Sequence, residues 1–164
     1  MIALDTTVLI YATGSQHPLR EPCRRLVDAV ADGLLTASTT VEVIQEFTHV
    51  RARRTDRGEA SLLAGSFTDL LAPLLPVGEA ALRHGLRIYI DAVRLGAFDA
   101  VLAAAAMAAE ADALVSADGA FAEVPGLRHL LPDDDGIAAL LPASHSTTAP
   151  QRYSRDPGAR GSGP

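Results

Sequence analysis

The sequence predicts an α/β protein in which helices flank a central, mostly parallel sheet. Short apolar runs, each about the length of one buried strand, alternate with longer segments whose apolar residues recur at helical spacing. The chain has 164 residues, of which 48% are hydrophobic and only 4% aromatic. It can therefore bury a single, mainly aliphatic core.

Four apolar runs predict the strands. Each is short, rich in Leu, Val, Ile or Ala, and bounded by polar residues, glycine or proline, which is typical of buried strands in a parallel sheet. The predicted strands are residues 1–4, 34–37, 113–116 and 127–131, with residues 74–75 as a further brief strand or a connector.

The segments between these runs predict helices. Pro18 suits the first turn of one helix, Ser38 or Thr39 can cap another, and the alanine-rich segment from residue 97 has the highest helix propensity. Asp135 can cap a last short helix after the acidic run at residues 133–135. The predicted helices before this last one are residues 8–13, 18–32, about 39–54, 59–71, 79–89 and 97–110.

The composition divides the chain in two. Residues 1–142 carry the alternating elements and form the predicted domain, whereas residues 143–164 consist mostly of Ser, Thr, Pro, Gly and Arg. Such a segment cannot bury an apolar core, so a disordered tail is predicted.

Charge and cysteine content narrow the function classes. The net charge is −6, and residues 1–142 hold 11 Arg against 19 acidic residues, a net of −8. This excludes a protein that coats nucleic acid broadly but allows a local basic site. The single Cys23 rules out an internal disulfide, and a catalytic thiol is not expected.

No membrane partner is expected, and a cytoplasmic location is predicted. The most apolar stretch, residues 98–107, is interrupted by Asp99 and is too short to cross a bilayer. No basic, apolar leader opens the sequence.

Three aspartates stand where α/β sheets commonly bind ligands. Asp5 and Asp118 follow the predicted strands at residues 1–4 and 113–116, and the carboxyl ends of parallel strands meet at one edge of a sheet. Asp99 begins the alanine-rich helix, where a favourable interaction with the helix dipole is the alternative explanation.

A fourth acid, Glu46, comes from the third predicted helix and borders its inward apolar stripe. That stripe comprises Val43, Phe47 and Val50. A carboxylate beside the core needs a cation or hydrogen-bond donors, and a salt bridge to an arginine is the alternative explanation. Glu42, on the same helix, is expected to lie further toward solvent.

If these four carboxylates meet, they repel one another unless a cation binds between them. Mg²⁺ and Mn²⁺ prefer carboxylate oxygens and water. Such ions lower the pKa of a bound water and stabilise the leaving oxygen when a phosphodiester bond is hydrolysed. Carboxylates that are far apart in the sequence but stand at strand ends suit this chemistry, and whether they meet is a question for the structure.

Four segments around these acids carry a family signature when taken together. They are IALDTTVL at residues 2–9, STTVEVIQEF at 38–47, FDAVLAAAA at 98–106 and LVSADGAF at 114–121. In order and spacing over about residues 1–131 they resemble the PIN-domain family, and in particular the VapC-type toxins of bacterial toxin–antitoxin pairs. The resemblance implies a three-layer α/β/α sandwich and a Mg²⁺- or Mn²⁺-dependent ribonuclease with Asp5, Glu46, Asp99 and Asp118 as its catalytic metal site.

The resemblance also implies roles for neighbouring residues. Thr6 matches the small hydroxyl residue after the first acid, Ser116 would orient the site, and Thr7 departs from the commoner Asn or Ser. Glu42 is an alternative to Glu46, which is favoured by its helical position and by the sequence QEF at residues 45–47.

The partners that the resemblance implies are an RNA substrate, a cognate antitoxin and a second copy of the chain in a homodimer. An acidic chain must bind RNA through a local basic group, and three groups are available. The first follows Glu46, and its alternative role is a solvated face or a docking patch for an acidic antitoxin. The groups are Arg51, Arg53, Arg54 and Arg57; Arg20, Arg24 and Arg25; and Arg83, Arg87 and Arg94.

Two other functions compete with the ribonuclease. Asp5 followed by Thr6 is similar to the start of a haloacid-dehalogenase-type phosphatase site, but Thr7 replaces the second Asp and the chain has no Lys. A catalytically inactive PIN-like module that binds RNA or protein is the second alternative, and the complete set of four acids argues against it.

Overall fold

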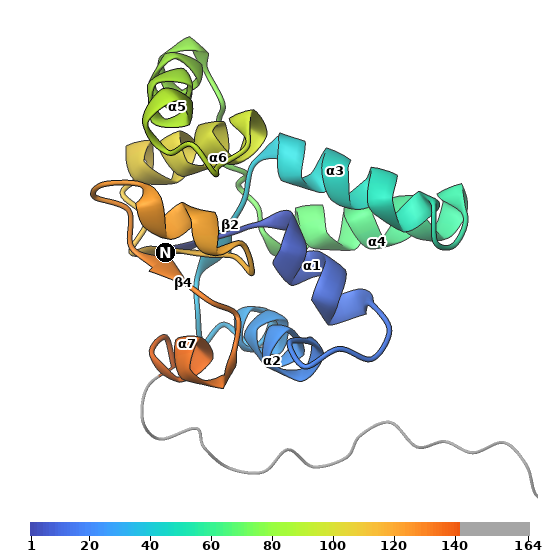
Figure 1. The fold of residues 1–164 in the computed structure, drawn as a ribbon. Coiled ribbons are helices and arrows are strands. Elements are labelled where there is room, and N and C mark those ends of the chain that lie inside the picture. The colour runs from blue at the N-terminus through green and yellow to red at the C-terminus, as the bar shows by residue number, and fades with distance from the viewer. Residues whose placement is uncertain (142–164) are drawn as a thin grey trace, which may run out of the picture.

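A central sheet of four parallel strands runs through the molecule, with helices on both sides (Figure 1). The computed structural model describes residues 1–141, so the predicted tail at residues 143–164 lies outside the described residues, and the domain boundary at residue 142 stays a prediction. The strand order is β2-β1-β3-β4. The strands are β1 (Ile2–Leu4), β2 (Ala37–Ser38), β3 (Ala113–Val115) and β4 (His129–Leu130).

Helices cover both faces of this sheet, and the predicted α/β fold is confirmed. They are α1 (Thr6–Thr13), α2 (Arg20–Ala31), α3 (Val41–Ala52), α4 (Arg57–Leu70), α5 (Glu79–Asp91), α6 (Ala97–Ala108), the 3₁₀ helix η1 (Gly119–Glu123) and α7 (Asp134–Ala138). In Figure 1, α5 and α6 lie above the sheet, α2 and α7 lie below it, and the pair α3 and α4 extends to one side. Among these helices, none is long and apolar enough to span a membrane.

The predicted strand at residues 34–37 is displaced in the structure to Ala37–Ser38. The amides of Leu34 and Leu35 both donate to the carbonyl of Ala29, and Gly33 adopts a φ of 71°. These residues therefore close the end of α2 and cannot join the sheet.

Three helix starts also differ from the prediction. Helix α1 begins at Thr6 because Asp5 caps it, and α7 is capped by Asp133, whose Oδ1 accepts from the Gly136 amide at 2.8 Å, not by Asp135. Helix α3 is capped by Thr40, not by Ser38 or Thr39. The hydroxyl of Thr39 is directed elsewhere and donates to the carbonyl of Leu4 at 2.6 Å.

The core is aliphatic and includes β1, β3 and the inner face of α6. Helix α5 packs closely against α6 where Gly85 meets Val101. A Cβ built on Gly85 would lie 2.7 Å from the Cα of Val101. This contact fixes α6, whose first turn carries Asp99.

Gly85→Ala is predicted to destabilise the protein by about 1–3 kcal/mol, since the new methyl group meets backbone that cannot move aside. Gly65→Ala on α4 is the matched control, because nothing lies within 4 Å of a Cβ there. The control is expected to be neutral or to stabilise by up to about 1 kcal/mol through helix propensity. Urea unfolding of both variants measures this, and equal midpoints would contradict the close approach.

Candidate active site

Asp5 stands at the carboxyl end of β1 and is only 4% exposed. The register pairs Leu4 with Val115, so the next residue on each strand, Asp5 and Ser116, emerges at the same edge of the sheet. The Asp5 amide donates to the Val115 carbonyl at 3.1 Å and continues the ladder to this point. Strand register therefore places a carboxylate beside a hydroxyl.

Two hydroxyl groups hold the Asp5 carboxylate. Its Oδ2 accepts from Ser116 Oγ at 2.7 Å and from Thr7 Oγ1 at 2.7 Å, with the Thr7 amide at 3.3 Å. Each hydroxyl is oriented in turn, because Ser116 Oγ accepts from the Asp118 amide and Thr7 Oγ1 from the Ala117 amide, both at 3.0 Å. Among residues 1–141, nothing donates to Asp5 Oδ1, and this oxygen is free to bind a ligand.

Glu46 is exposed on α3, and its Oε2 accepts from Thr6 Oγ1 at 2.7 Å. The hydroxyl residue after Asp5 thus orients a second acid. The alternative of a salt bridge to an arginine is wrong. Within the described part of the chain, none of Asp5, Glu46, Asp99 and Asp118 forms an ion pair.

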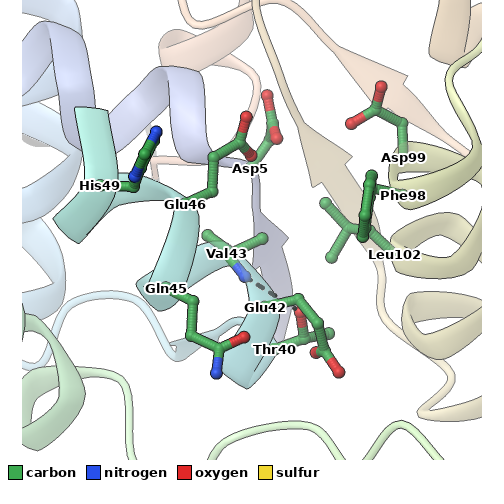
Figure 2. A pocket seen from close by; sticks show the side chains of 10 residues that line it. All are labelled: Asp5, Thr40, Glu42, Val43, Gln45, Glu46, His49, Phe98, Asp99 and Leu102. Atoms are coloured by element: carbon green, nitrogen blue, oxygen red, sulfur yellow. Dashed lines mark hydrogen bonds between the residues drawn. The ribbon is translucent and has the colours of Figure 1, made fainter.

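Glu42 was expected nearer to solvent than Glu46, and this prediction is wrong. Glu42 is half-buried, whereas Glu46 is exposed. The difference arises because the first turn of α3, which Thr40 caps, faces α6 across a pocket, whereas Glu46, one turn later, opens onto the edge of the sheet (Figure 2).

Asp99 lies half-buried in the first turn of α6. Burial raises the pKa of this carboxyl to about 6, and the negative charges of Asp5, Glu46 and Asp118 add to the shift. The Gly96 backbone acts in the opposite direction. All four acids are therefore within electrostatic reach of one another, although they come from four separate segments.

Asp118 is exposed and caps η1, with its Oδ1 accepting from the Ala120 amide at 2.8 Å. Asp118 follows shortly after β3, so its carboxylate lies at the same sheet edge as Asp5. The cap bond holds the carboxylate there. One of its two oxygens is used by the cap.

Two adjoining hollows contain the acids. A pocket of about 320 Å³ between α3 and α6 is lined by Asp5, Glu46 and Asp99 (Figure 2). A second, of about 330 Å³, shares these three acids and adds Asp118. The donor set of carboxylates without a cationic partner fits a hard divalent cation. Among residues 1–141, however, no three acids or other ligating side chains stand ready to hold one ion, so binding by three acids requires side-chain movement, which the exposed Glu46 and Asp118 permit.

The sequence did not reveal that Thr7 holds Asp5. The signal was present, since an aspartate often accepts from the residue two positions later. Cys23 is buried, and burial raises the pKa of its thiol to about 12. The prediction that it carries no chemistry is therefore consistent with its surroundings.

A four-stranded parallel sheet with carboxylates gathered at its carboxyl edge places the chain among α/β proteins with an acidic site, and the chain matches one family of that class. Residues 2–127 match the PIN domain. The chain belongs to the PIN-domain family, which confirms the resemblance drawn from its sequence.

Individual relatives agree with this assignment. The chain is 51% identical over 142 residues to Ribonuclease VapC7 of Mycobacterium tuberculosis, covering 86% of this chain and 98% of that protein. It is 25% identical over 130 residues to Ribonuclease VapC13 of the same organism, covering 79% and 99%.

Solved structures share the fold. VapBC2 from Rickettsia felis, bound to a DNA fragment from its promoter, matches with a TM-score of 0.63 and 18% identity. FitAcB from Neisseria gonorrhoeae matches with a TM-score of 0.64 and 21% identity. Each match covers 80% of this chain and 98% of the other.

Asp99→Asn is predicted to stabilise the protein in EDTA at pH 7.5. The folded-state pKa of Asp99, about 6, lies above its ordinary value of 3.8, so the native state binds the proton more tightly and loses stability as the pH rises between these values. The melting temperature of the variant should exceed that of the wild type above pH 6, and the gap should close toward pH 4.

Thermal unfolding from pH 4 to 8 measures this gap. Asp28→Asn, which removes an exposed acid from α2, is the control and should show no comparable pH-dependent gap. Equal melting temperatures of Asp99→Asn and wild type at pH 7.5, or a difference that grows toward low pH, would contradict the crowding of Asp99 by the other carboxylates.

Proposed function

We propose that this PIN-domain protein is a Mg²⁺- or Mn²⁺-dependent ribonuclease that acts as the toxin of a toxin–antitoxin pair. The observation that carries the proposal is the gathering of Asp5, Glu46, Asp99 and Asp118 at one sheet edge, where none of them forms an ion pair within residues 1–141. The 51% identity to Ribonuclease VapC7 supports RNA as the substrate and the hydrolase chemistry.

In this proposal Asp5 and Asp99 hold the main ion, and Glu46 and Asp118 complete the site. A divalent cation, when bound, lowers the pKa of a water and offsets charge on the phosphate. Ser116 and Thr7 fix the Asp5 carboxylate in place through their two 2.7 Å hydrogen bonds. Thr6 limits the movement of the exposed Glu46, and Asp99 must lose its proton before it can ligate.

The RNA backbone is expected to approach over the end of α3. Arg54 lines the same hollow as Asp5, Asp99 and Asp118, which suits a guanidinium that contacts a phosphate beside the scissile bond. Arg51 does not share this role, because it donates to the Thr13 carbonyl at 3.0 Å and pairs with Glu59.

The other predicted arginine groups are largely occupied. Arg20 and Arg24 lie near Glu21, while Arg25 pairs with Asp134, Arg83 with Glu79 and Arg94 with Glu123. Among residues 1–141, the arginines that form no ion pair are Arg53, Arg54, Arg57, Arg87 and Arg128. We assign Arg53, Arg54 and Arg57 to RNA because they follow the end of α3, where Arg54 lines the hollow that holds the acids.

A cognate antitoxin and the cytoplasm complete the proposal. Similarity to a VapC ribonuclease and to the VapBC2 complex supports an antitoxin partner, and the RNA substrate supports a cytoplasmic location. An inactive binding module remains the competing function, and the two differ in metal-dependent cleavage.

A homodimer is also proposed, with α5 at its interface. This helix exposes an apolar stripe of Leu82, Leu86 and Ile90, which Val93 continues just after the helix ends, with Ile90 73% and Val93 84% exposed. The four-residue spacing of Leu82, Leu86 and Ile90 places them along one side of α5. A second copy of the same helix is the partner we assign, because an isologous interface pairs one such stripe with itself.

Asp5→Asn is predicted to abolish RNA cleavage, because it removes the carboxylate around which the site is built. Ser116→Ala should lower cleavage by about 10–100-fold, as expected when a residue that orients a metal ligand is removed. The measurement incubates the purified chain with total RNA in Mg²⁺ or Mn²⁺, beside an EDTA control. Asp28→Asn should cleave like the wild type, and cleavage that persists in EDTA or in Asp5→Asn would reject the metal nuclease.

The double variant Ile90→Asp, Val93→Asp is predicted to be monomeric. Two charges on the apolar stripe cannot be buried against a second copy without a large desolvation cost. Light scattering coupled to gel filtration reads the mass directly. Leu62→Asp on α4 is the control, since Leu62 is 76% exposed but lies on a different helix; a dimer that survives the double variant would place the interface elsewhere.

A further inference from the structure

The pocket of about 320 Å³ between α3 and α6 continues into a further, mostly apolar hollow of about 400 Å³. The two hollows share one wall, which is formed by Thr40, Glu42, Phe98 and Leu102. We call the apolar hollow, together with this shared wall, the Glu42 pocket. It adjoins the four acids but has a different character, since its lining beyond Glu42 is largely apolar.

Glu42 has no role in the proposed metal site. Figure 2 shows its carboxylate at the far end of the pocket from Asp5 and Glu46, pointing away from them. The side chain is half-buried, and its Oε2 is buried with no hydrogen-bond partner among residues 1–141. A buried carboxylate oxygen without a donor is costly, so this atom marks a place for donors that a ligand would bring.

The start of α3 does not supply those donors. Glu42 lies in the first turn, where the helix dipole favours a negative charge. The nearby Val43 amide, however, already donates to Thr40 Oγ1 at 3.4 Å. The dipole therefore explains why a charge is tolerated here and leaves the buried oxygen unsatisfied.

Phe98 provides the second half of the pocket. It is 81% exposed and directly precedes Asp99 on α6. Solvent-exposed aromatic rings beside a nuclease site are stacking surfaces for unpaired bases. In Figure 2 the Phe98 ring lies between the Asp99 carboxylate and the Glu42 end of the pocket.

We propose that the Glu42 pocket binds an unpaired guanine base next to the scissile phosphate, with Phe98 stacking on the base and Glu42 accepting from its Watson–Crick edge. This inference rests on the proposed ribonuclease function. It adds a specificity-determining site to that function, and Glu42 and Phe98 are its binding residues.

Guanine is selected by the chemistry of the acceptor. A carboxylate offers two acceptor oxygens and no donor, and the guanine edge presents two adjacent N–H donors, at N1 and N2. Adenine and cytosine each place a ring acceptor beside their amino group, and uracil has a single N–H between two carbonyls. A carboxylate also repels phosphate, so an uncharged base is a better occupant than the RNA backbone.

The test of specificity uses the full chain and a randomised single-stranded RNA pool in Mg²⁺ or Mn²⁺, with sequencing of the cut ends. Wild type should favour guanine over adenine about fivefold to a hundredfold at one position within two nucleotides of the cut, the range for a bidentate contact. Glu42→Gln should move that preference toward adenine, because an amide presents one acceptor and one donor.

Two further variants separate the roles. Phe98→Leu should weaken cleavage of every sequence and keep the rank order of bases. Glu110→Gln, an exposed acid beyond the other end of α6, should keep the wild-type guanine preference. Equal base frequencies for wild type, or an unchanged preference in Glu42→Gln, would overturn the base pocket and leave the ribonuclease intact.

A binding experiment without metal tests the pocket independently of cleavage. NMR titration of the wild-type chain with guanosine should shift amides near Thr40–Val43 and Phe98–Leu102, with inosine weaker because it lacks the 2-amino group and adenosine weaker still. Guanosine-specific shifts without any RNA cleavage would support the pocket and reject the proposed nuclease. Shifts with N-acetyl-arginine amide but not with guanosine would overturn the proposal in favour of a protein side chain.

Discussion

The site depends on one buried carboxylate that is held at the junction of two parallel strands. Asp5 receives hydrogen bonds from Thr7 on its own segment and from Ser116 after β3. Its neighbour Leu4 accepts from Thr39, immediately before α3. The end of β1 is thus tied to both adjacent segments, and a one-residue slip in the register of β1 against β3 would separate Asp5 from Ser116. The positions of Glu46 and Asp118 follow from these ties.

Holding the four carboxylates close together destabilises the protein when no cation is bound. Burial and three neighbouring carboxylates raise the pKa of Asp99, and no arginine among the described residues forms an ion pair with any of the four acids. Hydroxyl and amide donors orient the acids but do not neutralise them. A structural ion pair would remove this repulsion and also fill the site, so the absence of one is the arrangement expected where an added cation completes the charge balance.

Much of this architecture could be predicted because local signals agree with the fold. Alternating apolar runs gave the parallel sheet, and acids that follow β1 and β3 had to share its edge. The displaced start of β2 could not be predicted, since the turn at Gly33 directs the amides of residues 34–35 to the carbonyl of Ala29 and away from the sheet. The burial of Glu42 was missed for a related reason: helical periodicity describes one helix, whereas α6 encloses the first turn of α3.

Two glutamates one turn apart on α3 illustrate how surroundings decide chemistry. Residues four apart lie near one another on a helix, and the helical periodicity favoured Glu46 for the acid site while placing Glu42 further toward solvent. Glu46 meets the Thr6 hydroxyl and opens toward Asp5 and Asp99. Glu42 meets the apolar side chains of Phe98 and Leu102 and keeps a buried oxygen without a donor. The first environment favours a cation among several carboxylates, and the second favours a flat, uncharged group that brings its own N–H donors.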